Sequence, residues 1–361
     1  MPLELDFHVI PDPQGFAPAL LLHGDWVFVT LSDGRHTGIG EATHSGDDQR
    51  CMKTISDLFD RRIRRMPVDL NAIREFEDEV LSTKPDFLTA TALSALNQAL
   101  YDLLARRRGV PVWRLLVEEP VRRQLPLYVT INRALTTRTH DDYRDVVYQV
   151  VERGFRHVKC APFERVHPDS DPLESSKPGL AVLSMLTAEF PHVTFRVDCH
   201  KRFTPEVFMQ LLPEFNRLGL FWIEEPFELG EAYVELRQQA GPKVAAGELF
   251  FGPEPFREMI TRLWTDVIMP DVKHVGGFGP LLKVCAAAAE QEVEVSPHNP
   301  SGPVSTAASS HGAAVYPGVT SLEIPFDRDR RRDVWHEHID GGVIHITDEP
   351  GWGIDLPKNA P

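Results

Sequence analysis

Three segments decide the fold: FRVDCH at residues 195–200, WIEEP at 222–226 and VAAGE at 244–248. Each is an apolar run followed by an acid, namely Asp198, Glu224 and Glu248, and the acids are about 26 and 24 residues apart. Strands that repeat at this interval form a parallel barrel whose C-terminal ends meet on one face. The spacing therefore predicts three carboxylates at the mouth of a barrel. Such an oxygen-only cage suits Mg²⁺ better than zinc.

The composition favours a globular protein that acts on small molecules. The chain has 361 residues, of which 42% are hydrophobic and 25% charged, and a net charge of −15. This acidic balance argues against nucleic acid or an anionic membrane as partner. No apolar run approaches the roughly 18 residues of a spanning helix, and the first residues do not resemble a signal peptide. The four cysteines are far apart with no CxxC pair, which indicates reduced thiols in a cytoplasmic protein.

The chain divides into a first part, a longer repeating part and a tail. Residues 1–122 show strand alternation followed by helical periodicity, and predict an α+β cap of three strands and a helical bundle. Residues 123–335 alternate strand and helix, which implies a parallel sheet. Eight strands favour a closed (β/α) barrel, a modified TIM barrel, over a doubly wound sheet. Residues 336–361 alternate again and are expected to return to the sheet of the cap domain.

The individual elements follow from the same periodicities. The barrel strands are expected at 125–130, 157–160, 193–197, 220–223, 243–246, 267–269, 293–296 and 320–322. The barrel helices are expected near 139–153, 176–189, 205–217, 230–239, 254–263, 278–291 and 303–314. The cap helices are expected near 47–65, 69–82 and 89–108.

Two further polar side chains stand where the next barrel strands end. Asp271 follows the sixth strand, and His298 lies about 27 residues on, in the loop SPHNPSGP at 296–303. That spacing makes the two residues neighbours, and a carboxylate beside an imidazole orients it and raises its basicity. Glu323 ends the eighth strand and completes the ring. We therefore expect an Asp271–His298 pair in the same cavity as the three acids.

Two cationic side chains near the acids each allow more than one role. His200 lies two residues after Asp198, and in a strand such residues point the same way. It is therefore expected in the cavity, as a metal ligand or as a general acid, and the acid role is favoured because three carboxylates already supply the cage. Lys159 ends the second barrel strand. It is expected either to bind a substrate carboxylate or to be an ordinary buried lysine.

Together these residues resemble the enolase superfamily and, within it, the mandelate racemase/muconate lactonizing enzyme-like group. The resemblance covers nearly the whole chain. Besides the segments quoted above, it rests on YDLL at 101–104, GFRHVK at 154–159, PD at 270–271 and PGWGI at 350–354. It implies a cap and a barrel, a Mg²⁺ cofactor, and a Lys or His base acting on a carboxylate substrate.

One departure from the racemase pattern shifts the expected reaction. Racemase-like members carry Lys-x-Lys at the end of the second strand, with the second lysine as a base, whereas this chain has Ala161 there. The histidine after the first acid and the loop around His298 look like the sugar-acid dehydratases, galactonate dehydratase in particular. In those enzymes the implied role of the histidine at the position of His298 is base, and of that at the position of His200 acid.

The resemblance thus implies Mg²⁺-dependent dehydration of a sugar acid. The three acids would hold Mg²⁺ and the substrate carboxylate, with Lys159 in support. His298, poised by Asp271, would remove the α-proton to give a metal-stabilised enediolate. Glu323 would contact this enediolate, and His200 would protonate the departing β-hydroxyl. The expected product is a 2-keto-3-deoxy acid.

Three other functions remain open at this point. A racemase or epimerase needs two bases, and Lys159 or His200 would have to replace the lysine that Ala161 lacks. A lactone cycloisomerase needs one base and no acid. A non-catalytic homologue would only bind a sugar acid.

Substrate specificity in such a fold is expected from the cap and the strand-end loops. The candidate substrate-binding residues are Phe16, His44, Asn132 and Lys159. The expected partner is a small carboxylate, with no nucleic acid and no membrane, and the chain is expected to form a homo-oligomer, a dimer or an octamer.

Overall fold

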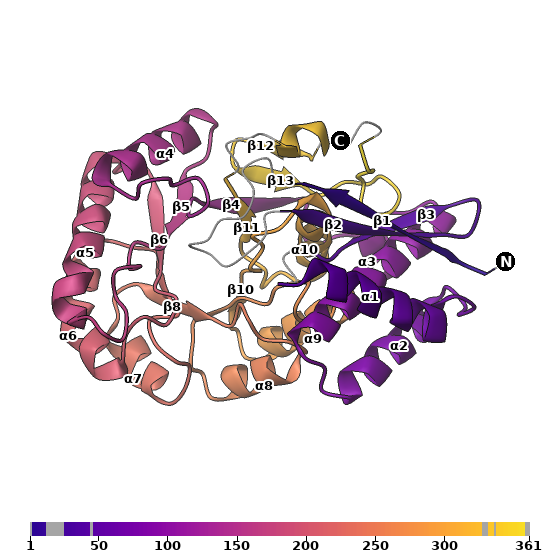
Figure 1. Ribbon diagram of the computed structural model, residues 1–361, viewed down its shortest axis with the longest axis horizontal. Coiled ribbons are helices and arrows are strands. Elements are labelled where there is room, and N and C mark those ends of the chain that lie inside the picture. Colours follow the sequence, from indigo (N-terminus) through magenta and orange to yellow (C-terminus); the bar gives the residue numbers. More distant parts are fainter. Residues whose placement is uncertain (1, 12–24, 44–45, 327–330, 336, 358–361) are drawn as a thin grey trace.

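The computed structural model describes residues 2–11, 25–43, 46–326, 331–335 and 337–357. Its N-terminal part is a cap in which helices lie beside an antiparallel sheet of order β1-β2-β3 (Figure 1). The cap strands are β1 Glu4–Ile10, β2 Trp26–Ser32 and β3 Thr37–Glu41. The cap helices are α1 Asp48–Leu58, continued by a π-helix at Phe59–Ile63, then α2 Leu70–Ser82 and α3 Phe87–Arg108.

Helix α3 is the central element of the cap, because its own side chains are mostly small or apolar and are buried on nearly every face. Residues 90–105 are buried without interruption, and the side chain of Asp86 caps the first turn. Strand β3 lies directly on the helix, since a Cβ atom at Gly40 would be 1.9 Å from the carbonyl oxygen of Ala95. Only glycine allows so close an approach. The helix therefore forms a layer between the cap sheet and the barrel.

Glu77 of α2 is a carboxylate buried where the cap meets barrel helix α9 (Phe278–Glu290). It accepts a hydrogen bond from Asn97 Nδ2 at 2.7 Å, and its other oxygen lies 3.9 Å from Lys283 Nζ. Burial raises the pKa of Glu77 from 4.5 to about 7. The folded state thus binds this proton more tightly than the unfolded chain does. The contribution of Glu77 to stability is fully present below pH 4.5 and is lost as the pH rises through about 7.

Replacing Glu77 by glutamine is expected to remove that loss of stability. The amide keeps an oxygen for Asn97 and has no proton to release. At a pH of about 8.5 the variant should be more stable than the wild type by on the order of 2 kcal/mol. Thermal unfolding across the pH range measures the difference, with Glu75→Gln, an exposed site on the same helix, as the control. Parallel pH curves for the Glu77 variant and the wild type would contradict the assignment.

The second part of the chain is a closed barrel of eight parallel strands (Figure 1). Neighbouring strands pair in chain order, β11 pairs with β4, and a bridge from Val295 to Val319 completes the ring between β10 and the approach to β11. The strands are β4 Gln124–Thr130, β5 His157–Cys160, β6 Thr194–Asp198, β7 Trp222–Glu224, β8 Lys243–Ala246, β9 Val267–Ile268, β10 Glu294–Val295 and β11 Leu322–Pro325. The predicted fold class is confirmed.

A helix follows each of the first seven barrel strands and packs outside the ring (Figure 1). These helices are α4 His140–Glu152, α5 Pro172–Glu189, α6 Pro205–Arg217, α7 Ala232–Gln239, α8 Glu254–Thr261, α9 Phe278–Glu290 and α10 Pro303–Val315. After β11 the described chain forms a short 3-10 helix at Arg331–Trp335. No helix in the described ranges has the length and apolar character needed to cross a membrane.

The tail differs from the prediction that it joins the cap sheet. Strands β12 Ile339–Asp340 and β13 Val343–His345 form a hairpin, and β13 pairs with β4 of the barrel. The reason is that β4 begins before β5 and β11, so the first residues of β4 have backbone hydrogen-bonding groups with no partner in the barrel. Strand β13 pairs with these residues. The tail reaches the cap only later, where Trp352 Nε1 donates to Ile39 O at 3.1 Å.

Candidate active site

The C-terminal ends of the barrel strands bring the predicted acids into one buried cluster. Asp198 ends β6 and Glu224 ends β7, and the two residues are partners in the parallel register. Glu248 follows β8, and Glu323 lies in β11. Each of these carboxylate residues is at most 7% exposed. The alternation of strand side chains directs Asp198, Glu224 and Glu323 to the inside of the barrel.

Lys159 of β5 lies in the middle of this cluster. Its Nζ is 2.8 Å from Glu224 Oε1, 3.2 Å from Glu323 Oε1 and 3.8 Å from Asp198 Oδ2. Burial by itself lowers the pKa of a lysine, but here the charges of Glu224 and Glu323 raise the pKa of Lys159 well above its ordinary value. The residue is therefore a fixed ammonium that bridges the acids of β7 and β11.

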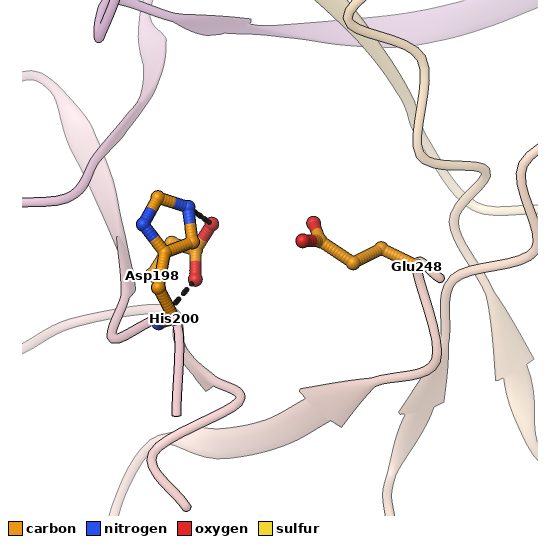
Figure 2. Close-up of side chains that lie close together, drawn as sticks. All are labelled: Asp198, His200 and Glu248. Atoms are coloured by element: carbon orange, nitrogen blue, oxygen red, sulfur yellow. Dashed lines mark hydrogen bonds and ion pairs between the residues drawn. The ribbon is translucent and has the colours of Figure 1, made fainter. Parts of the chain in front are cut away.

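Asp198, His200 and Glu248 form the group best placed to hold a metal ion (Figure 2). One ligand atom from each lies within 4.8 Å of the others, and the carboxylate of Glu248 points towards the other two side chains. Glu224 is outside this group, because Lys159 Nζ donates to its Oε1 and Trp222 Nε1 donates to its Oε2 at 3.0 Å. The position of Glu224 beside Asp198 is as predicted, and its role as a ligand stays a prediction.

His200 reaches the cavity by a route that the sequence did not suggest. Strand β6 ends at Asp198, and His200 and Lys201 adopt left-handed backbone conformations with φ of 48° and 55°. This turn brings His200 Nε2 to 2.8 Å from Asp198 Oδ2. The carboxylate raises the pKa of His200 to about 9 against the opposing effect of burial. His200 therefore faces the cavity as predicted, but it does so from a turn and not from the strand.

The charges inside the barrel fit a divalent cation. The buried acids are Asp198, Glu224, Glu248 and Glu323, and the buried cations beside them are Lys159 and Arg196. These four carboxylates outnumber the two cations, and Glu225 adds a further buried carboxylate beside them. The pKa of Glu248 is raised to about 8, by burial and then by the charges of Asp198 and Glu225. A hard divalent ion with oxygen ligands would relieve this repulsion.

Asp271 and His298 are in contact, although they lie at the ends of different strands. His298 Nδ1 is 2.9 Å from Asp271 Oδ2, and its Nε2 is 3.2 Å from Glu248 Oε2. Burial raises the pKa of an aspartate, but Lys273, His274 and His298 hold the pKa of Asp271 well below its usual range. The ionised carboxylate therefore fixes one ring nitrogen of His298 and leaves the other facing the acid cluster.

The cluster opens into a cavity of about 160 Å³ whose wall includes Asn132. Asn132 Oδ1 accepts a hydrogen bond from Ala161 N at 2.8 Å, so this side chain also ties β4 to β5. Phe16 and His44 lie outside the described residues. Sequence reasoning missed several further wall residues, namely Phe87, Arg133, Leu249, Lys273, His274 and Pro300.

Phe87 and His274 show why these wall residues were missed. Phe87 begins α3 of the cap, and its ring lies 4.2 Å from that of His274 of the barrel. No spacing in the sequence relates two residues from different domains. Lys273 and His274 carried a signal, because both are basic and lie two and three residues after Asp271.

Comparison with known proteins places the chain in a family. The model "Enolase C-terminal domain-like" matches residues 142–360, and "Mandelate racemase / muconate lactonizing enzyme, N-terminal domain" matches residues 13–117. The D-galactonate dehydratase of Verminephrobacter eiseniae is 26% identical over 344 residues, covering 92% of this chain and 88% of that protein. The D-gluconate dehydratase of Thermoproteus tenax is 28% identical over 341 residues, covering 92% of this chain and 68% of that protein.

Solved structures agree on the fold. A mandelate racemase/muconate lactonizing enzyme-like protein from Rubrobacter xylanophilus superposes with a TM-score of 0.86 at 24% identity, covering 99% of this chain and 95% of that one. A similar protein from Roseovarius has a TM-score of 0.85 at 23% identity, covering 99% and 93%.

The fold and the site define a class, an enzyme with a capped (β/α) barrel and a group of residues at the C-terminal ends of its strands that could hold a metal ion. The matched C-terminal model alone spans more than half of the chain. The chain belongs to the mandelate racemase/muconate lactonizing enzyme family of the enolase superfamily. The predicted superfamily is thereby confirmed, as is the prediction of an enzyme.

Proposed function

We propose that the chain is a Mg²⁺-dependent sugar-acid dehydratase. The observation that carries the proposal is a pair of histidines on one cavity, His298 held by Asp271 and His200 held by Asp198. Dehydration of a sugar acid needs a base for the α-proton and an acid for the β-hydroxyl. The relatives named D-galactonate and D-gluconate dehydratase support the same reaction.

His298 is the proposed base. The contact of its Nδ1 with Asp271 favours the tautomer in which Nε2 is free to accept a proton. Nε2 lies beside Glu248, where a substrate carboxylate would be held. A divalent cation on Asp198 and Glu248 supplies positive charge to that carboxylate when bound. The α-proton passes to Nε2, and the electron pair of the broken C–H bond moves towards the carboxylate.

His200 is the proposed acid rather than a metal ligand, because Asp198 raises its pKa to about 9 and a protonated imidazole does not bind a cation. It donates a proton to the β-hydroxyl as the C–O bond breaks, so that water leaves and the resulting enol converts to a 2-keto-3-deoxy acid. Lys159 donates to a carboxylate oxygen of the substrate, and Glu323 lies next to Lys159 Nζ at 3.2 Å. Atoms and charges balance, because the proton lost from the α-carbon matches the proton given to the leaving group.

Racemisation is disfavoured by the surroundings of the remaining bases. A racemase needs a second base opposite His298, and Ala161 occupies the position where the family carries a lysine. Lys159 cannot replace it, because Glu224 and Glu323 raise its pKa well above the ordinary value and keep it protonated.

A library of aldonic, aldaric and uronic acids tests the reaction class. Each acid is incubated with the wild type and Mg²⁺ in D₂O, and proton NMR follows water loss and exchange at the α-carbon. Formation of a 2-keto-3-deoxy acid is expected for at least one member. An inverted product without water loss would indicate an epimerase, and thermal stabilisation without turnover would indicate a binding protein.

Replacing His200 by asparagine is expected to separate the two proton transfers. Water loss should fall by about a hundredfold, the lower range for loss of a general acid, while exchange at the α-carbon persists because His298 is intact. NMR in D₂O measures both rates in one sample, and a Mg²⁺ titration shows whether the metal site is preserved. Full water loss in this variant would favour a one-base reaction such as cycloisomerisation.

A further inference from the structure

A guanidinium is buried beneath the acid cluster. Arg196 lies two residues before Asp198 in β6 and is 3% exposed. Its charged group stacks on aromatic rings, at 4.8 Å from the centre of Tyr128 and 4.5 Å from those of Phe221 and Trp222. Its Nε and Nη1 atoms are buried without a hydrogen-bond partner. A buried charge held by ring faces in place of a carboxylate is costly, so its retention calls for a reason.

Two of the rings around Arg196 carry groups that donate hydrogen bonds to acids of the cluster. Trp222 Nε1 donates to Glu224 Oε2 at 3.0 Å, and Tyr128 Oη donates to Glu323 Oε2 at 3.2 Å. The two rings meet edge to face with centroids 5.1 Å apart. Aromatic side chains therefore contact the guanidinium on one side and donate hydrogen bonds to the carboxylates on the other.

We propose that Arg196 is the fixed counter-ion of the metal-binding acids. It acts as a positioning residue whose positive charge offsets part of the negative charge of the site. The proposal rests on the proposed function in that it takes these acids as the Mg²⁺ site. Buried carboxylates outnumber buried cations in the inner barrel, and replacing Arg196 by a neutral residue would increase the negative surplus by one charge. The aromatic box of Tyr128, Phe221 and Trp222 keeps the field of this cation unscreened by solvent.

Replacing Arg196 by methionine tests the charge while retaining an apolar side chain of similar reach. In a Mg²⁺ titration without substrate at a pH of about 8, the variant should bind Mg²⁺ about tenfold more tightly, because one repelling charge is gone. With a sugar acid that the wild type converts, kcat should fall by about tenfold, since the negative charge that develops during proton removal loses a nearby cation. Arg196→Lys should return both values towards those of the wild type.

A purely structural role predicts a different pattern. Weaker Mg²⁺ binding together with a lower Tm would overturn the proposal, as would an unchanged Kd or a failure of the lysine variant to restore it. Arg217→Met, on the exposed end of α6, is the matched control and should leave both values unchanged. The Mg²⁺ titration needs no substrate, so it remains decisive even if the substrate class or the reaction is wrong.

A second variant covers the case in which Arg196→Met does not fold. Phe221 is 37% exposed and closes the box from outside. Phe221→Ala should admit water to the guanidinium and screen its charge, which shifts Mg²⁺ affinity and kcat in the same directions by a smaller factor. Unchanged values in a folded Phe221→Ala protein would overturn the proposal.

Discussion

Replacing His298 by asparagine is expected to lower the rates of both water loss and α-proton exchange by about a thousandfold, within the range for a lost general base. The asparagine side chain has a similar size and keeps a hydrogen-bonding group for Asp271, 2.9 Å from the imidazole in the wild type. It has no nitrogen that accepts a proton at neutral pH. Both rates should fall together because both begin with removal of the α-proton.

The two rates distinguish this variant from the His200 variant, in which only water loss should fall. Proton NMR in D₂O with the sugar acid identified by the library screen measures them. His192→Asn, an exposed histidine just before β6, is the matched control. Because His298 Nε2 lies 3.2 Å from Glu248 Oε2, a Mg²⁺ titration must accompany the assay. Full activity in the His298 variant would exclude this residue as the base.

Replacing Glu248 by glutamine is expected to have opposite effects on stability and on metal binding. Burial and the charges of Asp198 and Glu225 raise the pKa of Glu248 to about 8. Its ionised form therefore destabilises the metal-free fold above that pH, because the proton that the folded state favours has been lost. The metal-free variant should have a higher Tm than the metal-free wild type at a pH of about 8.5.

Addition of Mg²⁺ should reverse this order. At a concentration of about 100 times Kd, a ligand that binds only the folded state stabilises it by about 2.7 kcal/mol. The wild type should gain this stabilisation and the variant should lose most of it, together with activity. Glu254→Gln, on the exposed start of α8, is the control and should behave as the wild type. Equal Mg²⁺-induced shifts in the Glu248 variant and the wild type would rule out Glu248 as a ligand.

The barrel could be predicted closely because its signals are local. Helix α6 begins at Pro205, as its Thr204 cap indicates. Helix α5 begins at Pro172, earlier than predicted, and its signal was also present, since Asp171 caps the first turn. Strand β11 was placed too early, because short strands that are buried on both sides carry no alternation to mark their ends.

The acids, Lys159 and the Asp271–His298 pair lie close together as predicted, whereas their detailed geometry was predicted less well. The acids and the Asp271–His298 pair follow from one repeat length, which places every strand end on the same face. The orientation of Glu224 depends on Lys159 and on Trp222. Lys159 lies on β5 and Trp222 on β7, and each donates to a different oxygen of Glu224.

Residue patterns along the chain predict the superfamily, the capped barrel and the strand ends that carry the candidate site residues, because repeat length and side-chain alternation are properties of the linear chain. The distribution of charge in the site depends on the folded structure. In the folded protein Lys159 lies between Glu224 and Glu323, and Arg196 is surrounded by aromatic rings. A left-handed backbone conformation at His200 brings its side chain into contact with Asp198. Electrostatic energies in a buried site depend on separation and on exclusion of water, and neither is defined until the strands close into a ring.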